Sequence, residues 1–171
     1  MSGTTPPNRR RTLLRLATGL LTGLPVGPAL ASGTAALVWR DLGGFWLRLP
    51  PFMQQHAGGV DSRAGQLVGG GLRIDYDLGV YADPLTPRAG ALDRAQAAVV
   101  VDGLPAHVVR WRTLEPAPGR YLIGLHLPQI RPTVMGPLRL TLLAYGSDAE
   151  LVERARPMLL SLRLSAPPAL P

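Results

Sequence analysis

Apolar and charged residues alternate strictly along residues 72–78, and this period of two constrains the fold more than any other feature of the chain. The apolar set is Leu72, Ile74, Tyr76 and Leu78, and the polar set is Arg73, Asp75 and Asp77. Successive side chains of a β-strand point to opposite faces of its sheet. The pattern therefore predicts a strand with one face in an apolar core and the other in solvent.

Six further short apolar segments are typical of strands. They span residues 45–49, 97–101, 104–109, 121–127, 138–144 and 160–164. Asp102-Gly103 separates two of them and predicts a tight hairpin, because type I′ turns need two residues with positive φ. The polar, glycine-containing residues 54–64 are predicted to form a loop.

A helix is expected near the C-terminus. Ser147 and Glu150 have the spacing of a capping box, with Ser147 as the cap, and apolar residues follow at helical spacing. Pro157 is expected to stop or kink this helix. Together these elements predict an α+β fold, a mostly antiparallel sheet of about seven strands with one C-terminal helix packed on it. A β-sandwich is the alternative.

The first 31 residues have the basic start, apolar middle and small-x-small end of an export signal. The segment from Arg10-Arg11 through Leu13 and Leu14 to Arg15 resembles the twin-arginine export motif, although that family usually has Phe and Lys where Leu13 and Arg15 stand. A Sec signal is the alternative. Ala29-Leu30-Ala31 is the predicted cleavage site. The expected partners are the twin-arginine or Sec machinery, and the expected location is the periplasm or the extracellular space.

The apolar residues 16–31 contain two prolines and are shorter than the roughly 20 residues that a spanning helix needs. We therefore expect no stable membrane span after cleavage. The predicted organisation is a signal over residues 1–31, a linker over 32–44, one domain over 45–164 and a loose tail over 165–171. The chain has no cysteine, which excludes disulfides and thiolate metal sites.

The formal charge of +7 overstates the basic character of the domain. Four of the 18 basic residues lie in the predicted signal, which leaves 14 against 11 acidic residues and a charge of +3. Every basic residue is arginine, and after the predicted signal the arginines stand singly among other residues instead of clustering as in nucleic-acid-binding proteins. We expect no nucleic-acid partner.

Several fragments of the chain resemble a group of small exported bacterial proteins of unknown function. The most specific are Asp61-Ser62 and an Asp-Tyr-Asp-x-Gly pattern at residues 75–79, within a similarity that covers about residues 45–164. The layout is also similar to PsbP-like α/β sandwiches at the level of the fold. The resemblance implies an exported α+β domain and no particular activity, because one fold supports many functions.

Carboxylates form the main candidate site. Asp75 and Asp77 share a strand face, where paired carboxylates can serve a ligand, a cation or acid–base chemistry; a plain solvated face is the alternative. Asp61-Ser62 also suits a turn. Ser62 lacks the flanking residues of a nucleophile elbow.

We therefore predict a non-catalytic exported binding or accessory domain of the cell envelope, without a cofactor, that contacts an envelope protein or a small ligand. The predicted contact residues are Asp61, Ser62, Asp75, Tyr76, Asp77 and Tyr81. A hydrolase or isomerase that uses the carboxylates is one alternative. A metal-binding protein that uses His107, His126 and a carboxylate is another.

Overall fold

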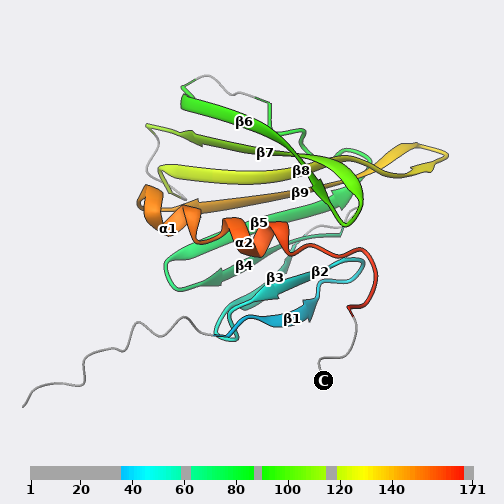
Figure 1. Cartoon of the computed structure of the whole chain (residues 1–171), viewed down its shortest axis with the longest axis horizontal. Helices are drawn as coiled ribbons and strands as arrows, with labels where there is room; N and C mark the ends of the chain where they lie inside the picture. The colour runs from blue at the N-terminus through cyan, green and yellow to red at the C-terminus, as the bar shows by residue number, and fades with distance from the viewer. Residues whose placement is uncertain (1–35, 59–62, 87–89, 115–118, 168–171) are drawn as a thin grey trace, which may run out of the picture. The chain divides into compact units, whose positions relative to one another are not determined.

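The computed structural model describes residues 36–58, 63–86, 90–114 and 119–167. Strands in these residues form a two-stranded sheet of order β1-β2 and a seven-stranded sheet of order β3-β4-β5-β9-β8-β7-β6 (Figure 1). The strands are β1 (Val38–Asp41), β2 (Trp46–Leu49), β3 (Gln54–Gly58), β4 (Arg63–Gly69), β5 (Leu72–Gly79), β6 (Leu92–Val101), β7 (Leu104–Arg112), β8 (Tyr121–Thr133) and β9 (Gly136–Gly146). Every pair of neighbouring strands is antiparallel.

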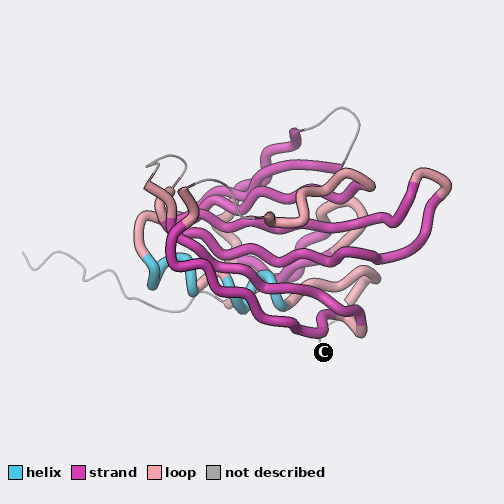
Figure 2. The backbone as a smooth tube through the Cα atoms, turned by 90° about the horizontal axis from the view of Figure 1, so that it is seen from above, coloured by secondary structure: helices cyan, strands magenta, loops and turns pink. Residues whose placement is uncertain are grey.

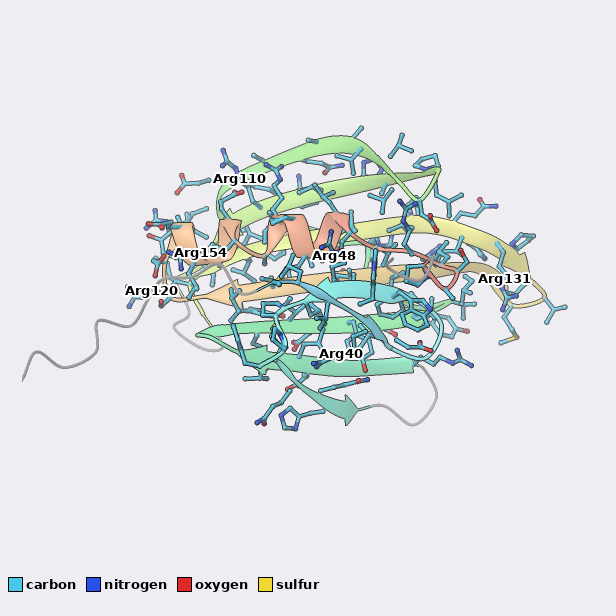
Figure 3. All side chains as sticks on the ribbon, turned by 60° about the horizontal axis from the view of Figure 1, so that its bottom comes forward. Arg40, Arg48, Arg110, Arg120, Arg131 and Arg154 are labelled. Carbon is cyan, nitrogen blue, oxygen red and sulfur yellow. The ribbon has the colours of Figure 1, made fainter. Side chains whose placement is uncertain are left out.

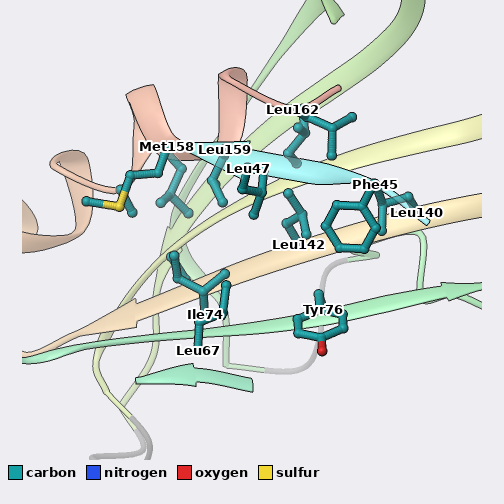
Figure 4. Close-up of a cluster of buried hydrophobic side chains, with 14 of the residues drawn as sticks. Phe45, Leu47, Leu67, Ile74, Tyr76, Leu140, Leu142, Met158, Leu159 and Leu162 are labelled. Atoms are coloured by element: carbon teal, nitrogen blue, oxygen red, sulfur yellow. The ribbon is translucent and has the colours of Figure 1, made fainter. Parts of the chain in front are cut away.

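The apolar core lies on one face of the large sheet, which we call the core face. The β1–β2 hairpin and two short helices, α1 (Ala149–Glu153) and α2 (Arg156–Leu160), cover this face (Figures 1 and 2). Leu47, Leu142 and Leu159 meet there and are at most 1% exposed (Figure 4). The rings of Phe45 and Tyr76 pack edge to face with their centroids 5.6 Å apart. The predicted α+β fold is therefore confirmed.

The helical segment differs in detail from the prediction. Asp148, and not Ser147, caps α1, because its side chain accepts a hydrogen bond of 2.8 Å from the Leu151 amide. The Ser147 hydroxyl instead donates to Asp148 at 3.1 Å. This cap and the Ser147 bond lower the pKa of Asp148. A carboxylate suits the position, because it also interacts favourably with the positive end of the helix.

The predicted last strand over residues 160–164 is wrong. Pro157 lies in the first turn of α2, where its missing amide hydrogen costs nothing, so it begins a helix turn instead of ending one. Leu160 ends α2, and only Arg163 makes an isolated bridge to Trp46. The alternation of leucines here reflects the end of a helix followed by one bridge.

The predicted loop over residues 54–64 is also wrong, since it contains β3 and the first residues of β4. β4 escaped detection because its core face carries Gly65 where an alternating pattern would have a large apolar residue. A Cβ on Gly65 would overlap the Tyr76 hydroxyl, so the glycine makes room for that ring. Part of the segment that we predicted as a linker is likewise regular: β1 pairs with β2 from Val38 to Asp41.

The predicted hairpin at Asp102-Gly103 is confirmed. Both residues have positive φ, 51° and 78°, and the turn joins β6 to β7. The Asp102 carboxylate also binds the chain after α2, through the Leu164 amide at 2.8 Å and the Arg163 guanidinium at 2.7 Å. These bonds lower the pKa of Asp102.

The predicted signal lies outside the described residues, and so do Arg10, Arg11, Leu13, Leu14, Ala29 and Ala31. Among the residues that are described, no helix is long and apolar enough to cross a membrane.

Candidate functional site

The second face of the large sheet, which we call the polar face, carries the predicted carboxylates. Strand register places Arg73, Asp75 and Asp77 on it, opposite the buried side chains of β5. Arg73 binds Asp75 through two hydrogen bonds of 2.7 and 2.8 Å, and these bonds raise the pKa of Arg73. The prediction that Asp75 and Asp77 share a face is confirmed.

A hollow of about 360 Å³ lies beside Asp75, towards the β3 edge of the sheet. Its side chains come from three adjacent strands in one cross-strand row, because His56 pairs with Gln66 and Gln66 pairs with Asp75. The small residues Gly58 and Ala64 line the next row and leave its floor open. The hollow therefore presents an imidazole, an amide and a carboxylate on three adjacent strands.

This row suits hydrogen bonding better than covalent chemistry. Imidazole and amide groups each donate and accept, whereas the carboxylate accepts only. Neighbouring strands lie about 4.8 Å apart, so with Gln66 between them His56 and Asp75 stand two strand spacings from each other. A base oriented by a carboxylate needs direct hydrogen-bond contact. Asp75 is moreover already bound to Arg73.

Asp77 occupies the next position along β5 on the same face. Its Oδ1 atom is buried and has no hydrogen-bond partner, the one such side-chain atom in the described part of the chain. A buried polar atom without a partner costs about 1–3 kcal/mol. Proteins commonly keep a buried polar group without a partner where that group has a functional role.

Three further polar groups continue the Asp77 row across the sheet. Asp77 pairs with Thr141 on β9, Thr141 with His126 on β8, and His126 with His107 on β7. The Thr141 hydroxyl donates to the backbone carbonyl of Asp83 at 2.6 Å. Its single hydrogen is then used, so its oxygen accepts from His126 Nδ1 at 2.9 Å. His126 therefore carries its proton on Nδ1.

Burial dominates the chemistry of His126. The side chain is 4% exposed, and burial, followed by the nearby charge of Arg139 and by His107, lowers its pKa. His126 is thus neutral at pH 7. His126, Thr141 and the backbone carbonyl of Asp83 form a hydrogen-bond chain between the sheet and the segment that crosses it.

The crossing segment is residues 80–86, which we call the strap. Its Leu85 is 3% exposed and packs over Gly124 of β8, where a Cβ would overlap the leucine side chain. Leu85 has a φ of 58°, which is strained for a branched side chain. The Asp83 carboxylate holds this conformation by accepting from the Leu85 amide at 2.8 Å. The strap and its apolar contacts bury the middle of the polar face.

The structure separates the predicted contact residues. Asp75 lines the hollow and Asp77 lies beside it on the polar face. Tyr76 also lines the hollow, but its side chain points into the core, is 5% exposed and accepts a hydrogen bond of 2.9 Å from Gln55. Tyr81 is 83% exposed at the start of the strap. Asp61 and Ser62 lie outside the described residues.

His56 and Gln66 were not predicted as site residues, because the sequence around β3 and the start of β4 was expected to form a loop. Residues 54–58 are three polar residues followed by alanine and glycine, and they carry no hydrophobic period that would indicate a strand. The strap was missed as well, because its role depends on Gly124, far away in the sequence.

Neither the metal alternative nor a basic surface gains support. Among the described residues, no three His, Asp or Glu side chains gather as they would around a metal ion. Six labelled arginines lie on separate parts of the fold (Figure 3). They are Arg40, Arg48, Arg110, Arg120, Arg131 and Arg154. These six do not form the continuous stripe that a nucleic acid backbone requires.

No protein-family model matches this chain, and no curated protein matches it as a relative. Its own residues and their geometry are therefore the basis for assigning a function.

Proposed function

We propose that this protein is a non-catalytic binding domain that takes a polar ligand in the hollow formed by β3, β4 and β5. The observation that carries the proposal is the row of His56, Gln66 and Asp75 along one side of a hollow of about 360 Å³. Ligand pockets commonly measure about 300–1,000 Å³ and use a few convergent polar groups for specificity.

The chemistry of the row indicates the class of ligand. His56 and Gln66 offer both donors and acceptors, and the negative charge of Asp75 is balanced by Arg73. A neutral molecule with several hydroxyl or amide groups matches this surface better than a strongly charged one. The small residues Gly58 and Ala64 also leave room for a ring-shaped group.

Binding is favoured over catalysis by the spacing of the same groups. The hollow pairs no base with a nucleophile, since Gln66 separates the imidazole from the carboxylate. The hydrolase or isomerase alternative needs Asp61 near Asp75, and Asp61 lies outside the described residues. An Asp61→Asn variant tests that alternative, because it would abolish any carboxylate-dependent turnover and leave ligand binding in the hollow intact.

Nuclear magnetic resonance with a panel of monosaccharides and small N-acetylated amides tests the proposed site. We expect amide shifts from a binding compound to concentrate at residues 54–58, 64–66 and 73–77. The double variant His56→Ala, Gln66→Ala should lose them. Arg131→Gln, in a separate hollow of about 310 Å³, is the matched control and should retain them. Shifts centred on Arg63 and Arg131 would contradict the proposal.

We also propose that the domain acts outside the cytoplasm, on the basis of the leader that contains Arg10 and Arg11. Cell fractionation of the wild type and of an Arg10→Lys, Arg11→Lys variant tests this. Twin-arginine export predicts that the variant stays in the cytosol, whereas Sec export tolerates two lysines. Recovery of the wild-type chain from cytosol with Met1 still attached would overturn the proposed location.

A further inference from the structure

A second hollow, of about 310 Å³, lies at one margin of the core face and shares no lining residue with the hollow of β3, β4 and β5. Two arginines, Arg63 and Arg131, line it. We call it the arginine hollow. Its other lining side chains are apolar, and they are those of Leu78, Ile130, Leu138 and Leu164.

Strand register places the arginine hollow where the apolar core meets solvent. Arg63 pairs with the buried Leu78, and Arg131 pairs with Leu138, which lies on the same face of β9 as the buried leucines of the core. The pairing of β9 with β5 begins only at Arg139, so no β5 residue pairs with Leu138. The hollow is therefore an apolar opening at the end of the core, with arginines at its rim.

The two arginines approach this opening from opposite sides. Arg63 lies on β4 and Arg131 on β8, and β5 and β9 lie between these strands. The Arg63 guanidinium also donates to the backbone carbonyl of Gly43, in the turn between β1 and β2, which holds it at the rim. Among the described residues, neither guanidinium has a carboxylate partner, and no acidic side chain lines the hollow.

Gly44, which also lines the arginine hollow, leaves space beside Arg63. A Cβ at this position would lie 2.7 Å from Arg63 Nη1 and 3.0 Å from Leu78 Cδ2. A side chain here would therefore enter the space between the guanidinium and the apolar floor. The φ of Gly44 is 144°, which also disfavours any other residue.

We propose that the arginine hollow binds a small organic acid, with the carboxylate at the guanidinium groups and the apolar part of the molecule against the apolar walls. A guanidinium binds a carboxylate through two parallel hydrogen bonds, and such charged bonds are about twice as strong as neutral ones. An apolar group gains free energy by leaving water for the walls. The volume is near the lower end of the range of about 300–1,000 Å³ for ligand pockets, which favours a small free acid.

Nuclear magnetic resonance titration of the full chain with octanoate tests the proposal. We expect saturable amide shifts that concentrate at residues 43–44, 63, 78, 130–131, 138 and 164. Two related compounds separate the contributions of charge and apolar surface. 1-Octanol lacks the charge and acetate lacks the chain, so each should bind at least about tenfold more weakly than octanoate.

Substitutions at the rim test the role of the charges. Arg131 is exposed and has no hydrogen bond or ion pair among the described residues, so Arg131→Gln should keep the fold and weaken octanoate binding about tenfold. Arg120→Gln is the matched control, because it removes the same charge at the opposite end of β8 (Figure 3) and should leave the affinity unchanged. Leu138→Glu should abolish binding, because the new carboxylate lies opposite Arg131 in the strand pair and competes with the ligand.

Far-ultraviolet circular dichroism shows whether each variant keeps its fold. Absence of saturable octanoate binding overturns the proposal, and so does 1-octanol that binds as tightly as octanoate. Equal affinities of Arg131→Gln and Arg120→Gln would show that the charge of Arg131 has no special role, which also contradicts it. Octanoate shifts centred on His56 and Gln66 would place the acid in the other hollow and overturn the assignment.

Discussion

The two faces of the large sheet are made by the same strands and differ in how they are covered. The core face is closed by a hairpin and two helices, and its side chains are almost entirely apolar. The polar face is closed only in the middle, where the strap lies over Gly124, and stays open at the β3 edge. The difference in covering decides where an open hollow can lie, because the hollow occupies the uncovered part of the polar face.

The largest expected effect is a difference in stability between two variants, one on each face, at adjacent residues of β9. Leu142 is fully buried on the core face, whereas Leu143 is half-buried on the polar face. We expect Leu142→Ala to lower the free energy of unfolding by about 2–5 kcal/mol, through lost burial and a cavity. Leu143→Ala should cost about 1 kcal/mol. Urea denaturation of both variants checks this, and equal losses would show that the faces do not differ.

A smaller loss of stability is expected from Gly124→Ala, because Gly124 lies under the strap. The new methyl group would overlap Leu85, so the strap must shift, at a cost of about 1–3 kcal/mol in unfolding free energy. With the strap displaced, His126 should gain solvent and its pKa should rise towards 6.5. Gly58→Ala is the control, since a Cβ there meets no atom within 4 Å. An unchanged His126 titration would indicate that the strap does not bury it.

Asp77→Val should raise stability instead of lowering it. The substitution removes a buried carboxylate oxygen that has no partner and adds a residue suited to strands, with an expected gain of about 1 kcal/mol. Asp75→Val should show no such gain, because it breaks the bond to Arg73. Thermal unfolding of the two variants makes the comparison. A loss of stability in Asp77→Val would mean that Asp77 is satisfied in solution.

The smallest effect is a dependence of stability on pH that originates in the strap. The folded pKa of His126 lies below 6.5, so the unfolded chain binds the extra proton first. Stability should therefore be full above pH 6.5 and decline below it, with a slope of at most about 1.4 kcal/mol per pH unit. His126→Gln should remove this decline. A separate loss below pH 3.8 should follow from Asp102, whose folded pKa is lowered.

Secondary structure could be predicted from the sequence wherever the local pattern of a segment agrees with its tertiary contacts. Strand β5 was predictable because each apolar residue of its alternation faces the core. The β6–β7 hairpin was predictable because Asp102-Gly103 meets the backbone needs of its turn by itself. Strand β4 was not, since Gly65 depends on Tyr76 of a different strand. The final strand was mispredicted because leucines at residues 160–164 serve a helix end and a single bridge.

The candidate site was predictable in part for the same reason. Asp75 and Asp77 share a face through the period of their own strand. The partners of Asp75 in the hollow come from β3 and β4, which have weak patterns. Tyr76 was grouped with its neighbours in sequence although strand geometry directs it to the opposite face.

Gln66 and Leu67 on β4 provide the most direct test of the division between the faces. They are adjacent in sequence, and Gln66 lines the hollow whereas Leu67 is fully buried in the core. The decisive measurement is the affinity of a hollow-binding compound together with the free energy of unfolding, for Gln66→Ala and Leu67→Ala. We predict that Gln66→Ala loses affinity and keeps stability within about 0.5 kcal/mol. Leu67→Ala should lose about 2–5 kcal/mol of stability, while its folded molecules keep the affinity. The reverse pattern, or equal losses of affinity, would contradict the assignment of binding to the polar face.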